Sequence, residues 1–136
     1  MLTRICSIAL LFFPLVVSAD TAKSILEATG TSGGLVVHLG SGDGKLTAEL
    51  KAGESFIIHG LDRKQEHVET ARKHIQSLGQ YGTVSVDRLK SDRLPYLDGI
   101  VNLVVSENGE GVSKEEIMRV LRPGGIAYLK QNGEWE

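Results

Sequence analysis

Three glycines lie close together directly after a short apolar run, in the segment His38-Leu39-Gly40-Ser41-Gly42-Asp43-Gly44. Because glycine has no Cβ, the backbone amides and carbonyls of such a bend can approach a ligand closely. A second apolar run ends in Gly60-Leu61-Asp62, which places Asp62 18 residues after Gly44. A carboxylate at this point can accept hydrogen bonds from both hydroxyls of a ribose. The two features together predict a pocket for a ligand that contains a nucleoside.

Three classes of ligand compete for a glycine bend of this kind, and the spacing separates them. A nucleoside triphosphate requires Gly-x-x-x-x-Gly-Lys followed by Ser or Thr, but Leu46 follows Gly44-Lys45 here. A dinucleotide favours Gly-x-Gly-x-x-Gly, whereas this bend has Gly-x-Gly-x-Gly and then Lys45, which leaves only a weak case for NAD. S-adenosylmethionine has a carboxylate and an ammonium at its methionyl end and suits a bend that offers amides and carbonyls together. Because many α/β proteins with such a bend bind nothing, these features alone leave the choice open.

The elements that must position the bend alternate along the chain between short apolar runs and longer helical patterns. This order predicts parallel βα units, and runs that are apolar on both faces are typical of strands covered by helices on both sides. The predicted strands are Leu35–Leu39, Phe56–Leu61, Thr83–Val86, Ile100–Val105 and Ile126–Lys130, and the predicted helices are a short one between Asp20 and Gly30, then Lys45–Lys51, Lys64–Leu78 and Lys114–Leu121. The predicted fold class is therefore α/β, a three-layer αβα sandwich with an open, mostly parallel sheet.

Two further motifs lie before the last two predicted strands. They are Leu94-Pro95-Tyr96-Leu97-Asp98 before the fourth strand and Arg119-Val120-Leu121-Arg122-Pro123-Gly124-Gly125 before the fifth. With the glycine bend and Asp62, they form an ordered set over nearly all of residues 35–130 that resembles the class I (Rossmann-like) S-adenosylmethionine-dependent methyltransferases. The Pro-Gly-Gly turn of the last motif is expected to end a helix after Arg122. The resemblance implies S-adenosylmethionine as cofactor and transfer of its methyl group to an unknown acceptor.

By this resemblance, ten positions of the chain are expected to line the cofactor site, and nine of them lie in the glycine bend or after it. Gly40, Ser41, Gly42 and Gly44 would surround the methionyl part, Asp62 would hold the ribose, Arg63 would flank the adenine, Leu89 and Lys90 would border the base, and Glu107 would lie in the loop after the fourth strand. In that loop, either Glu107 or Asn108 can position an acceptor; the alternative is a solvated, flexible loop. Methyl transfer from a sulfonium needs mainly alignment and an unprotonated nucleophile, so no catalytic residue is named.

The tenth position, His38, departs from the family's usual pattern. The family usually has Asp or Glu here, which reaches the ammonium of the cofactor, and Asn102 stands at another commonly acidic position. His38 is still expected to lie beside the cofactor, but an imidazole cannot supply the same negative charge. Loss of a charge-assisted hydrogen bond of about 1.5–3 kcal/mol would weaken binding by roughly one to two decades. A satisfied structural histidine is the alternative at this position.

The first 19 residues are predicted to be a secretory signal peptide. Arg4 precedes the apolar run Ile5–Val17, and the small residues of Val17-Ser18-Ala19 suit cleavage. The mature domain would span residues 20–136 and lie in the periplasm or outside the cell, without a stable membrane span; an uncleaved membrane anchor is the alternative. The only cysteine, Cys6, lies in this leader, so the mature domain would have no disulfide and no thiolate ligand.

Charge and histidine spacing argue against two other kinds of site. A formal net charge of −2 gives no basis for non-specific binding of nucleic acid. His67 and His74 lie seven residues apart on one predicted helix and His59 lies in a strand, with no further ligand nearby. No metal site is therefore predicted.

The predicted sheet lacks the last strands of the family. Family members usually continue past the fifth strand into a helix and two more strands, whereas this sequence stops at Glu136. An edge formed by Ile126-Ala127-Tyr128-Leu129 would leave backbone groups unpaired, so a missing segment, a C-terminal domain or a partner is expected to cover it. Two other interpretations stay open. One is a degenerate, non-catalytic S-adenosylmethionine-binding-like or interaction module in an exported protein, and the other is a nicotinamide-dependent oxidoreductase.

Overall fold

A six-stranded sheet forms the middle of the fold in a computed structural model that describes residues 18–131 and 134–135. The strand order is β3-β2-β1-β4-β5-β6, with β1 to β5 parallel and β6 antiparallel to β5. The elements in chain order are α1 (Ser18–Thr29), β1 (Gly34–Leu39), α2 (Lys45–Glu49), β2 (Phe56–Asp62), α3 (Gln65–Ser77), β3 (Val84–Arg88), β4 (Val101–Ser106), the 3₁₀ turn η1 (Gly109–Gly111), α4 (Lys114–Val120), β5 (Leu121–Gln131) and β6 (Glu134–Trp135). The predicted α/β fold class with an open, mostly parallel sheet is confirmed.

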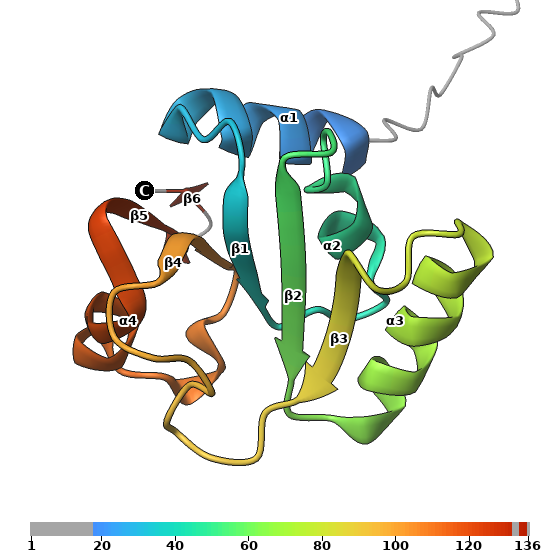
Figure 1. The fold of residues 1–136 in the computed structure, drawn as a ribbon. Coiled ribbons are helices and arrows are strands. Elements are labelled where there is room, and N and C mark those ends of the chain that lie inside the picture. Colours follow the sequence, from blue (N-terminus) through green and yellow to red (C-terminus); the bar gives the residue numbers. More distant parts are fainter. Residues whose placement is uncertain (1–17, 132–133, 136) are drawn as a thin grey trace, which may run out of the picture.

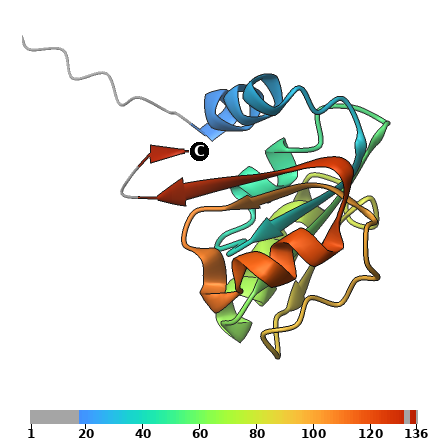
Figure 2. The same cartoon turned by 90° about the vertical axis from the view of Figure 1, so that its left-hand side faces the viewer.

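Helices cover both faces of the sheet (Figure 1 and Figure 2). Successive side chains of a strand point to opposite faces, so Val36 and Val37 of β1 belong to two different buried clusters. The Val36 cluster includes side chains of α1, α2 and α3, among them Ile75. The Val37 cluster includes Ile117 of α4 and Leu94 from the connection between β3 and β4. The strands that are apolar on both faces therefore lie where the sequence predicts them, in the middle of three layers.

The segment around Pro123 folds differently from its prediction. Leu121 already has extended backbone angles (φ −68°, ψ 131°) and pairs with Val101, so β5 begins directly after α4. The register then shifts before regular pairing resumes at Ile126. The residue before proline is disfavoured in the helical region, so Arg122 also lies in the strand and α4 does not continue past Val120. The predicted helix Lys114–Leu121 therefore ends one residue early, at Val120. The expected end of the helix after Arg122 is wrong, because the Pro-Gly-Gly turn forms an irregularity within β5.

The outer edge of β5 is paired over a short length by described residues. Lys130 pairs with Trp135, and Gln131 pairs with Glu134, in a short antiparallel hairpin. The edge that was expected to need a cover therefore has one at its carboxyl end. What covers the rest of β5 stays a prediction.

α1 begins at Ser18, inside the segment predicted as a signal peptide. Residues 1–17 of that segment lie outside the described part of the chain. Within the described part, no helix is both long enough and apolar enough to cross a membrane.

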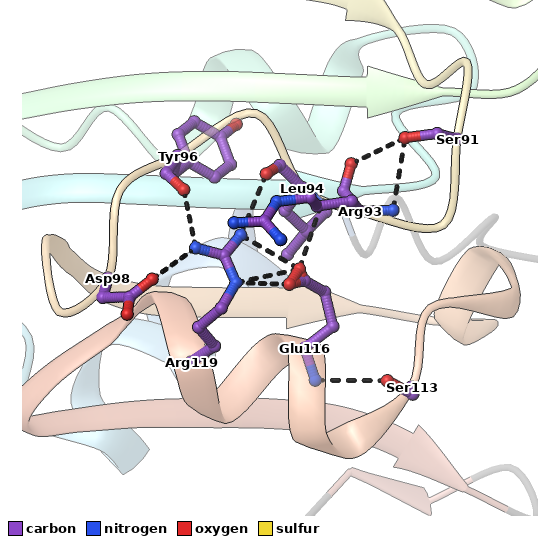
Figure 3. A network of polar contacts seen from close by, with 8 residues as sticks. All are labelled: Ser91, Arg93, Leu94, Tyr96, Asp98, Ser113, Glu116 and Arg119. Carbon is purple, nitrogen blue, oxygen red and sulfur yellow. Dashed lines mark hydrogen bonds and ion pairs between the residues drawn. The ribbon is translucent and has the colours of Figure 1, made fainter.

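The connection between β3 and β4 has no helix and is fastened to α4 by a pair of charged side chains (Figure 3). The Arg119 guanidinium donates to the carbonyls of Leu94 at 3.1 Å and Tyr96 at 2.9 Å. It also donates to Asp98 Oδ1 at 2.7 Å and to both oxygens of Glu116, one of which accepts the Leu94 amide at 3.2 Å. The shape of this irregular connection is therefore set by α4, a later element of the chain.

Asn102, at a position expected to be acidic in the family, lies near the amino end of β4. Its Oδ1 accepts the Leu35 amide at 3.1 Å, so the side chain completes the start of β1. A Cβ on Gly34 would lie 2.3 Å from the Asn102 Cγ, which only glycine avoids. The carboxyl edge of the sheet, where the glycine bend lies, is at the other end of these strands.

Candidate cofactor-binding site

The carboxyl ends of β1 and β2 lie side by side, because the strands are parallel and Leu39 pairs with Leu61. The amides of Gly40 and Ser41 both donate to the Leu61 carbonyl, at 2.7 and 3.2 Å. The bend then enters α2 through Gly44, whose left-handed backbone (φ +81°) suits glycine. The bend and the tip of β2 thus form one edge, which is the usual ligand side of an open α/β sheet.

The carboxylate of Asp62 faces the glycine bend. Asp62 is 2% exposed, and its Oδ2 accepts the Gly42 amide at 3.0 Å. Its Oδ1 accepts the Lys64 amide at 2.9 Å, and His67 Nδ1 lies 3.1 Å from both oxygens. The side chain therefore ties the start of α3 to the bend and presents a negative charge between them.

His38 lies buried against α2, with one ring nitrogen partnered and the other open. Its Nδ1 lies 2.7 Å from Thr47 Oγ1, whereas its Nε2 is buried without a hydrogen-bond partner among the described residues. The hydroxyl of Ser41 is buried and unpartnered in the same sense. Burial lowers the pKa of His38 to about 4, and the negative charge of Asp62 opposes this in part. His38 is therefore neutral at neutral pH and only half satisfied as a structural histidine.

His38 is expected to make the stability of the fold depend on pH. An unfolded histidine has a pKa of 6.5, and the folded one a pKa of about 4, so the unfolded state binds the proton first as the pH falls. Stability is complete above about pH 6.5 and decreases as the pH falls toward about 4, by about 3 kcal/mol in total. Urea unfolding at about pH 7 and about pH 4 should show this extra loss in the wild type and not in His38→Asn. An identical pH dependence of the two proteins would contradict this assignment.

The glycines of the bend are required for different reasons. A Cβ on Gly40 would lie 2.9 Å from Glu110 Oε1, so this position faces the loop after β4. A Cβ on Gly42, at φ +54°, would meet no heavy atom within 4 Å and lies on the open side of the bend. A Cβ on Gly44 would lie 2.8 Å from both Cα and Cβ of Ala71. The close approach of α3 therefore accounts for the glycine at position 44.

The loop after β4 covers part of the bend. Asn108 Oδ1 lies 3.0 Å from the Cβ position of Gly40, beside the carboxylate of Glu110. Arg63 holds this loop, because its Nε donates to the Glu110 carbonyl at 2.7 Å while its Nη2 donates to Asp92 Oδ1 at 2.7 Å. Polar side chains of the protein thus occupy part of the space over Gly40, and a ligand in that space requires them to shift.

The remaining predicted residues reach this edge only in part. Leu89 is buried, and its amide donates to the Asp62 carbonyl at 2.9 Å. Lys90 is exposed and lines a cavity of about 490 Å³ beside β2 and β3. Glu107 is exposed and lines a separate cavity of about 220 Å³ on the outer side of the bend, together with Asp43. The structure therefore groups Asp62 with the bend and leaves Lys90 and Glu107 at its margins.

Sequence reasoning missed Glu110, the acidic residue nearest to Gly40. Its signal in the sequence is a glycine on each side, in Gly109-Glu110-Gly111, in the loop that follows a predicted strand. All three residues have positive φ, and Glu110 (+47°) is the only described non-glycine residue that does. Backbone of this kind in a non-glycine residue is uncommon and gathers at functional sites.

The groups at this edge are suited to recognition of a polar ligand. They comprise a buried carboxylate, backbone amides, a hydroxyl and a neutral imidazole. Within the ranges that the structure describes, no three His, Cys, Asp or Glu residues are arranged to hold a metal ion. A glycine bend that faces a carboxylate across adjacent parallel strands is the arrangement found in nucleoside-binding α/β domains.

A family comparison narrows this class. The family model described as "Methyltransferase domain" matches residues 36–125, which contain the bend, Asp62 and the Pro-Gly-Gly turn. The chain belongs to this family, the class I S-adenosylmethionine-dependent methyltransferases.

Individual relatives agree with this assignment. Methyltransferase GfsG of Streptomyces halstedii is 30% identical over 102 residues, which cover 70% of this chain and 36% of that protein. A crystal structure from Methanococcus maripaludis, assigned as an S-adenosyl-L-methionine-dependent methyltransferase, has a TM-score of 0.75 at 25% identity and covers 87% of this chain and 57% of its own. The [4+2]-cyclase SpnF shares the fold alone, with a TM-score of 0.72 at 24% identity over 82% of this chain and 43% of its own. The chain thus spans less than two thirds of the length of these relatives.

Proposed function

We propose that this domain binds S-adenosylmethionine at the glycine bend and transfers its methyl group to an acceptor. The observation that carries the proposal is the position of Asp62, whose buried carboxylate faces the bend and contacts the Gly42 amide. A carboxylate has about four acceptor sites, so contacts to Gly42 and Lys64 at one oxygen each leave capacity for ribose hydroxyls. The side chain of His67, which is half-exposed, can move away from Asp62 when the ribose hydroxyls bind.

The polar atoms beneath the bend support the same ligand. Buried polar groups without a partner are uncommon in folded proteins, and Ser41 Oγ and His38 Nε2 are two of them. We assign Gly40, Ser41 and Gly42 to the methionyl part, together with His38. The backbone of this bend carries no Cβ at positions 40 and 42, which leaves its amides and carbonyls accessible.

The adenosine end would extend from Asp62 toward the connection after β3. The Leu89 amide donates to the Asp62 carbonyl, and its side chain would offer an apolar surface to the base. The exposed Lys90 would border the base from the solvent side. Arg63 would flank the base once its guanidinium leaves the Glu110 carbonyl. Glu107 faces the outer side of the bend, which we assign to the acceptor.

When bound, S-adenosylmethionine would supply an electrophilic methyl group on a sulfonium. The residues of this chain would then act by alignment, since holding two reactants in a productive orientation removes several kcal/mol of the barrier, about 7–11 kcal/mol in the best cases. Similarity of fold also includes a cyclase, so the reaction is argued from the site and the family, not from the fold.

A binding titration tests the proposal directly. Isothermal titration with S-adenosylmethionine and with S-adenosylhomocysteine is expected to show saturable binding of both at one site. Incubation with a panel of small-molecule and protein acceptors is then expected to release S-adenosylhomocysteine. Absence of binding by either nucleoside would overturn the proposal, and binding without turnover on any acceptor would leave a recognition domain.

Location and partners are separate proposals. The apolar start of the sequence supports export to the periplasm or beyond, and mass spectrometry of the mature N-terminus would detect cleavage after Ala19. The part of the β5 edge that β6 does not reach supports a further segment or a partner at that edge. Hydrogen exchange of the β5 amides, with and without the remainder of a longer protein, would show whether they become protected.

A further inference from the structure

A second carboxylate lies at the glycine bend besides that of Asp62. Glu110 Oε1 lies 2.9 Å from the position that a Cβ on Gly40 would take, so this oxygen contacts the first residue of the bend. Glu110 is partly buried. Its carboxylate has no hydrogen bond or ion pair with any described residue. A partly desolvated anion without a partner favours a cation beside it.

The neighbouring groups do not supply that cation or compete for it. Asp62 already accepts two backbone amides and contacts His67, so its charge is committed to the tip of β2. The imidazole of His38 is neutral and carries no charge of either sign. The guanidinium of Arg63 is engaged with the Glu110 carbonyl and with Asp92, and not with the Glu110 carboxylate.

We propose that Glu110 binds the ammonium of the methionyl group and so supplies the negative charge that His38 cannot. The inference rests on the proposed function, because it assigns one residue to one group of that ligand. It places the anion on the loop after β4 instead of on β1, which carries His38.

The loop is built to hold the Glu110 side chain in this place. The Glu110 amide donates to Asn108 Oδ1 at 3.2 Å, and the Gly109 amide donates to Ser106 Oγ at 2.7 Å. The carbonyl of Glu110 accepts from Arg63, so its backbone is fixed on both sides of the Cα. An L-residue in the left-handed region is unfavourable, yet the chain keeps a glutamate there. A carboxylate on a flexible side chain can move aside to admit the methionyl group and then pair with it.

Two ligands that differ at the methionyl end test this assignment. S-adenosylhomocysteine carries the ammonium, whereas 5′-methylthioadenosine carries the same adenosine without ammonium or carboxylate. Glu110→Gln, which keeps the size of the side chain, is expected to weaken S-adenosylhomocysteine binding by about tenfold to hundredfold and to leave 5′-methylthioadenosine binding within about twofold. Glu110→Gly suits the positive φ and removes the carboxylate, and the same selective loss is expected.

A charge-matched control is Glu115→Gln, because Glu115 is exposed in the first turn of α4. It is expected to bind both ligands as the wild type does. Equal affinity of wild type and Glu110→Gln for S-adenosylhomocysteine would overturn the inference, as would tighter binding of both ligands by Glu110→Gly, which would make Glu110 a plug over the bend. A wild type that binds neither ligand would overturn the proposed function itself, and the inference with it.

Discussion

Replacing Asp62 by asparagine is expected to reduce the affinity for S-adenosylhomocysteine by about 100-fold or more. Asparagine keeps the shape of the side chain but loses the charge, and one of its two terminal atoms becomes a donor. That donor would face either the Gly42 amide or the Lys64 amide, both of which now donate to Asp62. The variant therefore loses the negative charge and one of the two acceptor oxygens toward the ribose, and its new donor repels the backbone amide that it faces.

The same change is expected to destabilise the fold. One partly buried backbone amide would be left without its acceptor, which costs about 1 kcal/mol. Urea unfolding measures this loss, and isothermal titration at a temperature where the variant is folded measures the affinity. Asp43→Asn is the matched control, since Asp43 is an exposed carboxylate in the same bend that accepts the Lys45 amide. If Asp62→Asn and Asp43→Asn bind the ligand equally well, Asp62 does not hold the ribose.

Alanine at position 44 is expected to destabilise the protein by about 2–4 kcal/mol. Its Cβ would lie 2.8 Å from the Cα and Cβ of Ala71, so α3 would have to move away from α2. Part of the cost comes from the left-handed backbone (φ +81°), which an L-residue adopts with a penalty of about 1–2 kcal/mol. The rest comes from overpacking against a helix backbone that cannot rotate aside.

Gly42→Ala separates these two contributions to the loss of stability. Gly42 also has positive φ (+54°), but no heavy atom lies within 4 Å of its Cβ position. The free energy of unfolding of Gly42→Ala should therefore decrease only by the backbone penalty of about 1–2 kcal/mol. Equal losses for the two variants in urea unfolding would show that contact with α3 does not determine the glycine at position 44.

The sheet is predictable from the sequence because its signals are local. The apolar runs that become β1 and β4 are short and apolar on both faces, as buried parallel strands are. The end of α4 is less predictable, because Leu121 pairs with Val101 in the sheet instead of continuing the helix. Pairing of this kind depends on a strand about 20 residues earlier and leaves no trace in the local pattern.

A residue of the site is predictable from the sequence only where ligand binding is the one physical explanation for that residue type at that position. Asp62 at a strand tip is such a case, and its carboxylate faces the bend. Gly44 looks like part of a ligand-binding bend, but its position is explained by contact with Ala71. Glu110 could not be placed, since its approach to Gly40 depends on contacts of its loop with Arg63 and Asn108. Long-range contacts of side chains, more than local motifs, decide which residues face the bend.

The contact of Asn102 with the start of β1 explains how an amide can stand at a position where the family commonly has a carboxylate. The Asn102 Oδ1 accepts the Leu35 amide, and an aspartate would present an oxygen at the same place. Asparagine and aspartate at position 102 can therefore both accept the Leu35 amide, and this contact lies at the opposite end of the strands from the glycine bend. This arrangement also requires glycine at position 34, because a Cβ there would collide with the side-chain amide of Asn102. The departure at Asn102 therefore concerns the amino end of the sheet, where the side chain holds the start of β1, and not the glycine bend at the carboxyl edge.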